Sequence, residues 1–346
     1  MTDQELIEQF YKNKYYISYS GLSKLLFSPK LFYTHYILQQ KEEAVGAHLV
    51  EGRLIHCLLL QPDEYDNQFY VAKSKLPSDN IKDIVDRIFK EHPECSDLSN
   101  FQQEILNILI EKNLYQTLKT DEQRLAKVIT DITNDYLTDL INSIGKSVID
   151  QATYDKALRI VTKFKENPDV RYHLGLDITE FDTAKCHREL PASCDLVDYK
   201  FGIKGILDSV IVDDVNKVIK IADVKTTSKT IPEFKDSVEY YNYWLQAAMY
   251  ILLAKCHFLK LDYTYEYSFV VVDKYEQIYC FPVSQLTLDN WNDRFKKALN
   301  EAHYHYENRD YSLPYEYIVT KIIRSEEHTS ELQSHHDLVC RLLLEK

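Results

Sequence analysis

The chain of 346 residues is long enough for one large domain or two domains of ordinary size. Its net charge of −13 excludes a general electrostatic attraction to nucleic acid, so any such binding requires a local basic groove. Seven cysteines without paired spacing predict reduced thiols in the cytoplasm, and the acidic, polar start and short apolar runs argue against a targeting peptide and a membrane helix.

Residues 1–76 are expected to form an N-terminal helical part of the core domain. A first helix begins near Ser20, a residue type that caps helices, and a second begins at Pro29, because proline favours the first helical turn. Lys30 on the second helix could reach a phosphate of a bound nucleic acid. Simple packing of two helices explains most of this segment.

A third helix is expected over about 50–60, where the apolar residues recur at helical spacing. Gly52 and His56 are four residues apart on it and share a face, so the small residue leaves room beside the imidazole. Taken alone, His56 is more simply explained as a packed histidine than as a metal ligand.

Residues 77–170 differ in composition from the rest of the chain. Strand-type runs disappear, and Lys, Glu, Asp, Leu and Ile recur at helical spacing, with one long helix expected over about 125–141. This pattern predicts a helical insertion packed on the core, and solvation explains its charged outer faces.

A strand that enters the core is expected directly after the insertion, over 177–181 and 183–187. Its first part contains Glu180, a candidate for a third carboxylate beside the two described next. An exposed position on an edge strand explains Glu180 equally well.

The hairpin expected over 205–226 carries the strongest chemical pattern. Residues two apart in a strand share a face, so Asp223 and Lys225 emerge side by side. If 214–217 form a four-residue loop, Asp208 lies directly opposite Asp223. Two carboxylates so close repel each other unless a cation lies between them, and hard oxygen ligands suit Mg²⁺ or Mn²⁺. A solvated strand edge with an incidental Asp–Lys pair is the alternative.

The C-terminal part of the core supplies a helix from Ser237 to about Lys255, on which Gln246 and Tyr250 share a face. The hydroxyl of Thr226, at the end of the hairpin, can bond to the backbone or to a phosphate. The remaining expected elements are strands over 263–272 and 276–281 and a helix over 291–306. This order predicts an α/β fold with a mixed central sheet flanked by helices.

Three motifs then carry a family resemblance: GILD at 205–208, DVK at 223–225 and QAAMY at 246–250. They resemble the D…(D/E)xK…QxxxY series of the PD-(D/E)xK nuclease superfamily, and more narrowly the RecB-type and phage exodeoxyribonuclease VIII-like exonucleases. Two earlier segments, YISYSGLSKLLFSPKLFYTHY and EGRLIHCLLLQPDEYDNQFYV, are similar to the opening and the G-x-x-x-H segment of that group.

The resemblance implies a restriction-endonuclease-like α/β fold: a mixed central sheet flanked by helices, with a helical insertion, and the nuclease core at 171–310. It implies that His56, Asp208 and Asp223 are metal ligands, with the backbone carbonyl of Val224 as a fourth. The expected ion is Mg²⁺ or Mn²⁺. The chain lacks the four-cysteine set of the iron–sulfur relatives, so no iron–sulfur cluster is expected.

The same resemblance gives roles to the neighbouring residues. Lys225 would orient or activate the attacking water and steady the phosphate, and Gln246 would position Lys225 or the water, with support from Tyr250. Glu180 matches the early acidic position of the family less securely. Leu207 replaces the proline of the nominal PD pair, a departure that divergent members share.

The implied activity is that of a Mg²⁺-dependent exonuclease acting 5′→3′ on the ends of duplex DNA in phage-type recombination or DNA processing. The implied partners are DNA, a single-strand annealing recombinase and further copies of the chain in a ring, inside a bacterial host. The alternatives are a non-catalytic DNA-end binding or recombination accessory protein, and a structure-specific or restriction-type endonuclease on the same fold.

The C-terminal segment is expected to be foreign to the protein. Residues 324–334, RSEEHTSELQS, resemble a translated sequencing adapter. Residues 324–346 are therefore expected to be a non-native tail, and the histidines within it are not treated as metal ligands.

Overall fold

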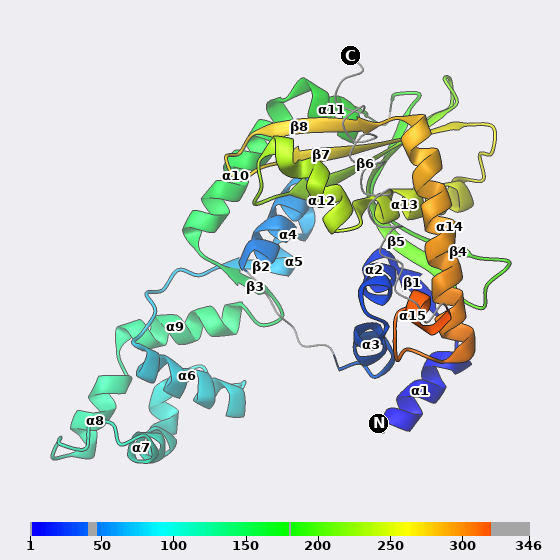
Figure 1. Cartoon of the computed structure of the whole chain (residues 1–346). Helices are drawn as coiled ribbons and strands as arrows, with labels where there is room; N and C mark the ends of the chain where they lie inside the picture. The colour runs from blue at the N-terminus through cyan, green and yellow to red at the C-terminus, as the bar shows by residue number, and fades with distance from the viewer. Residues whose placement is uncertain (1, 41–46, 180, 320–346) are drawn as a thin grey trace. The chain divides into compact units, whose positions relative to one another are not determined.

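The computed structural model describes residues 2–40, 47–179 and 181–319 (Figure 1). The chain forms two compact units, one made of Met1–Val45 and Thr162–Lys346 and the other of Gly46–Val161. No helix among the described residues has the length and apolar character needed to cross a bilayer. The Glu180 position and the adapter-like segment lie outside the described residues.

The unit formed by Gly46–Val161 is mostly helical. Its elements are α4 (Ala47–Leu60), η2 (Pro62–Glu64), α5 (Tyr65–Gln68), α6 (Asp79–Glu91), η3 (Leu98–Phe101), α7 (Gln102–Glu111), α8 (Asp121–Val128), α9 (Asp131–Asn142), most of α10 (Gln151–Glu166), and the parallel strands β2 (Phe69–Val71) and β3 (Ser147–Ile149). Ile84, Leu109 and Leu137 are buried in a core of their own. The long helix expected over 125–141 is two helices, because Thr130 caps α9 at its start.

The other unit is built on a mixed sheet of six strands. They are β1 (Tyr16–Ser18), β4 (Lys185–Asp195), β5 (Gly202–Asp213), β6 (Val218–Thr226), β7 (Thr264–Val272) and β8 (Ile278–Val283). The order is β1-β5-β6-β7-β8, with β4 on β5; the pairs β1/β5 and β6/β7 are parallel and the other pairs are antiparallel. The mixed central sheet with flanking helices expected from the sequence is confirmed.

The central strand β5 changes partners along its length. Gly202–Lys204 pairs with β1 and Ser209–Asp213 pairs with β6, while β4 runs along β5 through both parts. Since a strand has only two edges, β1 and β6 share the same edge of β5. The segment 205–208 therefore lies at a fork in the sheet, between the ends of two partner strands.

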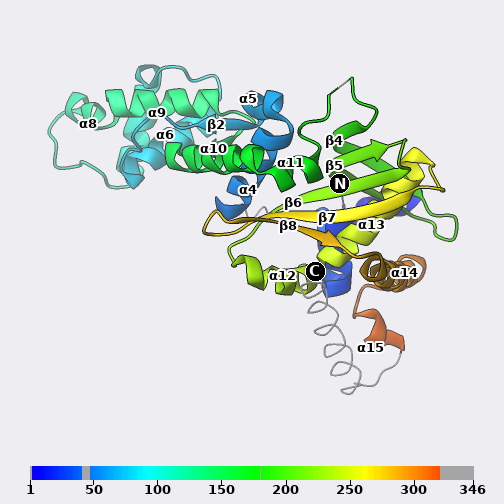
Figure 2. The same cartoon turned by 90° about the horizontal axis from the view of Figure 1, so that it is seen from above.

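Helices cover both faces of this sheet (Figure 2). The elements on one face are α2 (Tyr19–Phe27), α12 (Phe234–Tyr240), α13 (Tyr243–Phe258) and α14 (Gln285–Asn308), which share a large hydrophobic core with the strands. The other face carries α11 (Pro168–Leu174), whose Leu174 carbonyl accepts a 3.0 Å hydrogen bond from the hydroxyl of Ser209. Because neighbouring residues of a strand point to opposite faces, Asp208 points away from α11.

The remaining described elements are α1 (Asp3–Lys12), α3 (Pro29–Phe32), the π-helical turn η1 (Tyr33–Ile37), η4 (Ile231–Glu233) and α15 (Tyr315–Val319). The helix expected to begin near Ser20 is capped two residues earlier, by Ser18, whose hydroxyl accepts from the amide of Gly21 at 3.2 Å. The helix expected from Ser237 is interrupted, because Asn242 adopts a left-handed conformation with φ of 56° between α12 and α13.

The strand expected over 177–181 and 183–187 begins later than predicted: residues 177–179 form no strand, and β4 starts at Lys185. β4 continues to Asp195 and contains Pro191, which it can accommodate because it is an edge strand that pairs only with β5 among the described strands. The pairing partner on β5 lies downstream in the sequence, so the local pattern alone did not reveal the length of β4.

One cysteine expectation is wrong. Cys194 of β4 and Cys256 of α13 form a disulfide, although 62 residues separate them. The packing of α13 against β4 brings the two together, which no local spacing could indicate. The other described cysteines, Cys57, Cys95, Cys186 and Cys280, are not in disulfides.

Candidate active site

The hairpin of β5 and β6 has the register expected from the sequence. Asp213 pairs with Val218 and Ser209 pairs with Ala222. The regular pairing stops there, and the same register places Asp208 opposite Asp223 at the fork. The predicted register is confirmed, and it puts both carboxylates on the face that α13 covers.

Asp208 is held by the backbone of the neighbouring strand. Its Oδ2 accepts a buried hydrogen bond of 2.7 Å from the amide of Val224. Where β5 and β6 separate, the side chain of Asp208 therefore accepts the hydrogen bond that a backbone carbonyl would accept in a regular sheet. The residue is only 7% exposed, so its carboxylate is largely removed from water.

Asp223 lies between an amide and an ammonium group. Its Oδ1 accepts a 2.7 Å hydrogen bond from Nε2 of Gln246, and its Oδ2 forms an ion pair with Nζ of Lys225. The side chain of Asp223 is 1% exposed and that of Lys225 is 15% exposed. A buried carboxylate in this position requires positive charge and hydrogen bonds around it, since burial disfavours the charged form.

The surroundings of Lys225 keep its ammonium group charged. Burial lowers the pKa of Lys225, but attraction to Asp223 and Asp208 outweighs this effect and raises the pKa above its ordinary value. The Nζ atom also lies 4.8 Å from the ring centre of Tyr243, which adds a cation–π contact. Lys225 is therefore a cation near neutral pH.

The side chains of α13 approach β5 closely at Gly205. A Cβ atom on Gly205 would lie 2.9 Å from Cε1 of Tyr250, so a larger residue would force the ring of Tyr250 to move. Tyr250 is buried next to Gln246, and burial together with the charges of Asp223 and Asp208 raises its pKa. Gln246 and Tyr250 thus form one wall of the site, on the shared face expected from their spacing.

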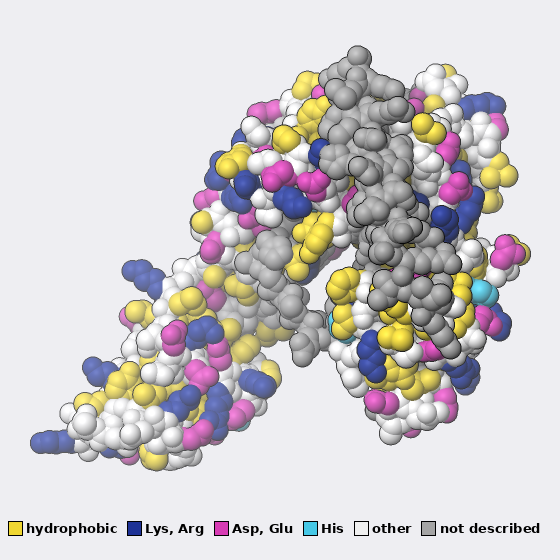
Figure 3. All heavy atoms as spheres, viewed as in Figure 1, with side chains coloured by type: hydrophobic (Ala, Val, Ile, Leu, Met, Phe, Trp, Pro, Cys, Tyr) yellow, Lys and Arg dark blue, Asp and Glu magenta, His cyan; other side chains and the backbone are white. Residues whose placement is uncertain are grey.

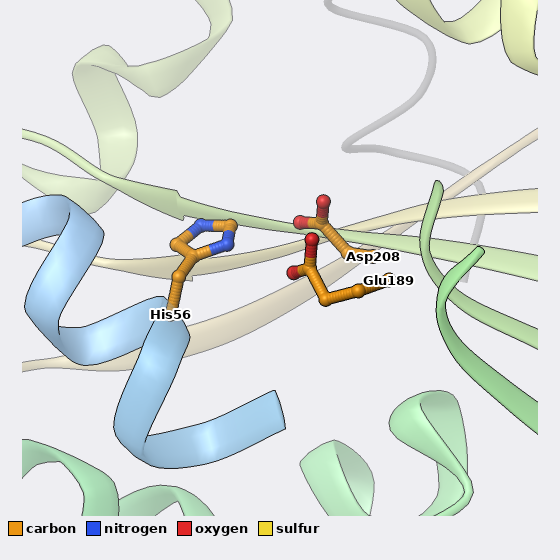
Figure 4. A group of neighbouring side chains, drawn as sticks. All are labelled: His56, Glu189 and Asp208. Carbon is orange, nitrogen blue, oxygen red and sulfur yellow. The ribbon is translucent and has the colours of Figure 1, made fainter. Parts of the chain in front are cut away.

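The structure adds a carboxylate that the sequence reasoning missed, Glu189 of β4. It lies opposite Asp208 in the register of β4 and β5, and oxygens of the two carboxylates lie within 4.8 Å of each other (Figure 4). Glu189 has φ of 46°, and its pair with Asp208 is missing from an otherwise continuous ladder. Such a left-handed conformation is uncommon for a non-glycine residue and tends to occur at functional sites.

These side chains fit a hard divalent cation. Asp208 and Glu189 bring carboxylate oxygens together, the ligand type that Mg²⁺ and Mn²⁺ prefer, and Asp223 lies on the neighbouring strand. Their three negative charges exceed the single positive charge of Lys225. Two partly buried carboxylates side by side, with a third one strand away, are stabilised when a cation binds between them.

The other residues expected at the site lie on different elements. Thr226 is half-buried at the end of β6, and Lys30 lies exposed on α3 with its Nζ atom 5.8 Å from the ring centre of Tyr33. His56 is half-buried on α4, in the unit formed by Gly46–Val161. The structure does not describe Glu180, the third carboxylate expected from the sequence.

Comparisons with known proteins place the chain in a family. The sequence profile of the PD-(D/E)XK nuclease superfamily matches residues 16–312, and the chain belongs to that superfamily. No curated protein matches the chain. Among solved structures, a protein of Eubacterium rectale described as a candidate exonuclease is similar, with 12% identity, a TM-score of 0.47, and coverage of 91% of this chain and 90% of that one.

Membership defines the class of activity. The chain is a nuclease of this superfamily, whose substrates are nucleic acids and whose members typically use a divalent metal ion. The carboxylates of Asp208 and Glu189 are a site of the kind that such an ion requires.

Proposed function

We propose that the protein is a Mg²⁺- or Mn²⁺-dependent deoxyribonuclease that removes nucleotides 5′→3′ from the ends of duplex DNA, in recombination or DNA processing. The observation that carries the proposal is the buried carboxylate of Asp223, which bonds Gln246 through one oxygen and Lys225 through the other. This is the (D/E)xK and glutamine series of the family in one contact network, beside the second carboxylate, Asp208.

The proposed metal ligands are Asp208, Asp223 and the carbonyl of Val224, to which we add Glu189 because of its position beside Asp208. We extend the set to His56, on the ground that its GRLIH segment matches the G-x-x-x-H segment of the family. A bound divalent ion would neutralise charge on the scissile phosphate and lower the pKa of an attacking water.

The protein groups around this ion have separate proposed roles. Lys225 holds positive charge where the phosphate gains negative charge, and it orients the water. Gln246 fixes the carboxylate of Asp223 through its 2.7 Å hydrogen bond, and Tyr250 supports Gln246 from the next turn of α13. The amide of Val224 fixes Asp208 in the same way.

We also propose contacts to DNA outside the metal site, and protein partners. Lys30 and Thr226 are proposed contacts to DNA phosphates. A single-strand annealing partner and a ring of several copies would fit an exonuclease that prepares single strands for recombination. Glu180 stays a candidate acidic residue and competes with Glu189 for that role.

The experiment that tests this function compares DNA forms. End-labelled linear duplex and closed circular duplex are each incubated with the protein in Mg²⁺ and in EDTA. An exonuclease degrades only the linear form and only with Mg²⁺, and separate 5′ and 3′ labels give the polarity. Cleavage of the circle would favour an endonuclease, and end binding without cleavage would favour an accessory protein.

A variant ties the activity to the site. Lys225→Ala should lower the rate of linear DNA degradation by about three orders of magnitude, because it removes charge stabilisation at the phosphate. Lys220→Ala is the matched control, since Lys220 lies on the same strand and points to the other face. Normal digestion by the Lys225→Ala protein would refute the assignment.

A further inference from the structure

A second feature of the unit with the mixed sheet is a pocket lined by tyrosines and cations. It has a volume of about 540 Å³ and lies between the ends of α1 and α14 and the turn from β4 to β5. We call it the tyrosine pocket; the lining residues used below are Tyr11, Tyr199, Tyr306, Lys12, Lys200 and Arg309. Figure 1 shows α1 beside the C-terminal end of α14.

The pocket is basic, in contrast to the rest of the chain. Four of its nine lining residues are Lys or Arg and one, Glu307, is acidic, whereas the whole chain has a net charge of −13. On the face seen in Figure 3, Lys and Arg side chains are interspersed with Asp and Glu. Cations gathered at one pocket of an acidic chain therefore point to an anionic ligand.

These cations are accessible to a ligand. Lys200 forms an ion pair of 2.7 Å with Glu307, but 72% of its side chain is exposed. Such an exposed pair contributes little to stability, so Lys200 can bind a phosphate in place of Glu307. Lys14 pairs with Asp195 in a similar, exposed contact of 2.8 Å. Among the described residues, Lys12 has no ion-pair partner.

The aromatic rings add a second kind of contact. The rings of Tyr11 and Tyr306 lie 5.1 Å apart, and the guanidinium of Arg309 lies 4.4 Å from the ring centre of Tyr11. The ring centre of Tyr199 lies 5.4 Å from that of Phe201, and all three tyrosines of the pocket are half-buried. Partly accessible aromatic rings beside cations are the combination with which proteins bind single-stranded nucleic acid, since bases stack on the rings and phosphates contact the cations.

We propose that the tyrosine pocket binds a single-stranded segment of DNA. This inference rests on the proposed function, because it extends the substrate path of a deoxyribonuclease. From Gly202, next to the pocket, to Asp208 is six residues of β5, or about 20 Å. That span corresponds to about six phosphates of a B-form strand. One strand can therefore occupy the tyrosine pocket while its end, or the end of its complement, lies at the active-site carboxylates beside Asp208.

The test measures binding without cleavage. A fluorescent oligothymidine strand is titrated with the full-length protein in EDTA, over a range of salt concentrations, and the anisotropy gives Kd. The pocket variant is Lys12→Ala/Lys200→Ala. The control is Lys119→Ala/Lys127→Ala, which removes the same charge from exposed positions in the Gly46–Val161 unit. A third protein, Tyr199→Leu, tests stacking, and melting temperatures report folding.

The pocket variant should bind about tenfold more weakly or worse, and the slope of log K against log salt should fall by about 1.4, since each phosphate contact to a single strand contributes about 0.7. The control should stay within about twofold of wild type, and Tyr199→Leu should lose about tenfold with an unchanged slope. Equal Kd and slope for the wild-type and pocket-variant proteins would overturn the proposal.

This experiment separates the pocket from the nuclease assignment. If the wild-type protein cleaves no DNA in Mg²⁺ but the pocket variant loses strand binding, the proposed activity fails and the binding site stands. If cleavage occurs and the pocket variant binds strands normally, the activity stands and the pocket proposal fails.

Discussion

The amide of Val224 donates a 2.7 Å hydrogen bond to Oδ2 of Asp208, at the fork where β5 leaves β6. The bond joins the two strands after their regular pairing has ended at Ser209 and Ala222. It fixes one carboxylate of the candidate site through the backbone of the strand that carries the other, Asp223. Main-chain geometry therefore sets the distance between the two acidic residues without the need for an ion between them.

The carboxylate of Asp208 has two effects that variants can distinguish: its charge attracts a metal ion, and its hydrogen bond to Val224 stabilises the fold. Asp208→Asn keeps an oxygen that can accept from Val224, so stability should be retained while Mn²⁺ binding, followed by calorimetry, is lost. Asp208→Ala leaves a buried amide without its acceptor and should cost about 1–3 kcal/mol in urea unfolding. The prediction is wrong if Asp208→Asn binds Mn²⁺ like wild type or is as unstable as Asp208→Ala; Asp214→Asn, on the exposed hairpin turn, is the control.

Gln246 should act as a positioning residue. Gln246→Met keeps the bulk of the side chain but removes the donor to Asp223, and kcat should fall about 10–100-fold with a smaller change in KM. Mn²⁺ affinity should fall as well, which a purely structural defect would not produce at unchanged melting temperature. Gln285→Met, at the exposed start of α14, should leave both values unchanged.

Glu189 and Glu180 are alternative candidates for the third acidic metal ligand, and variants of the two should behave differently. Glu189→Gln should weaken Mn²⁺ binding about tenfold or more, because one of two carboxylates within 4.8 Å loses its charge. Glu180→Gln should have no such effect. Calorimetric titration of both proteins decides between the two positions, and the reverse result would restore the assignment made from the sequence.

The disulfide should stabilise the unit with the mixed sheet. Cys194 and Cys256 close a long loop, which by chain entropy corresponds to about 4 kcal/mol. The Cys194→Ser/Cys256→Ser protein should therefore unfold at lower urea concentration, and a reducing agent should affect only the wild type. A thiol titration of the denatured, unreduced protein should find two fewer thiols than its seven cysteines; seven reactive thiols would contradict the bond.

Asp139 should make the stability of the helical unit depend on pH. Its carboxylate accepts from the hydroxyl of Tyr70 at 2.8 Å and from the amides of Lys73 and Ser74 at 3.1 and 2.8 Å. Burial raises the pKa of Asp139, but these hydrogen bonds outweigh burial and lower it. A lowered folded-state pKa means stability that is present above the unfolded-state pKa of about 3.9 and lost as the pH falls below it.

The corresponding variant is Asp139→Ala. It should cost about 1.5–3 kcal/mol near pH 7, and the difference from wild type should shrink below about pH 4. Urea unfolding at both pH values measures this, with Asp135→Ala, exposed on the same helix, as the control. A difference that is the same at both pH values would show that the charge of Asp139 plays no part.

Much of the site could be predicted because its signals are local. The register of the β5–β6 hairpin depends on a four-residue turn, and the alternation of side chains along β6 places Asp223 and Lys225 together. Gln246 and Tyr250 follow from helical spacing, and the break at Asn242 does not alter their shared face. These features depend on residues a few positions apart, which a sequence displays directly.

The sequence by itself determined the mixed sheet flanked by helices, the pairing that sets Asp208 against Asp223, and the class of chemistry that those residues support. Only the tertiary structure decided that Glu189 lies beside Asp208, that Cys194 meets Cys256, and that three tyrosines and four cations line one pocket. These contacts join segments far apart in the chain. They depend on how the sheet pairs and how the helices pack on it, and hydrophobic periodicity, the main signal in a single sequence, does not specify which distant side chains those arrangements bring together.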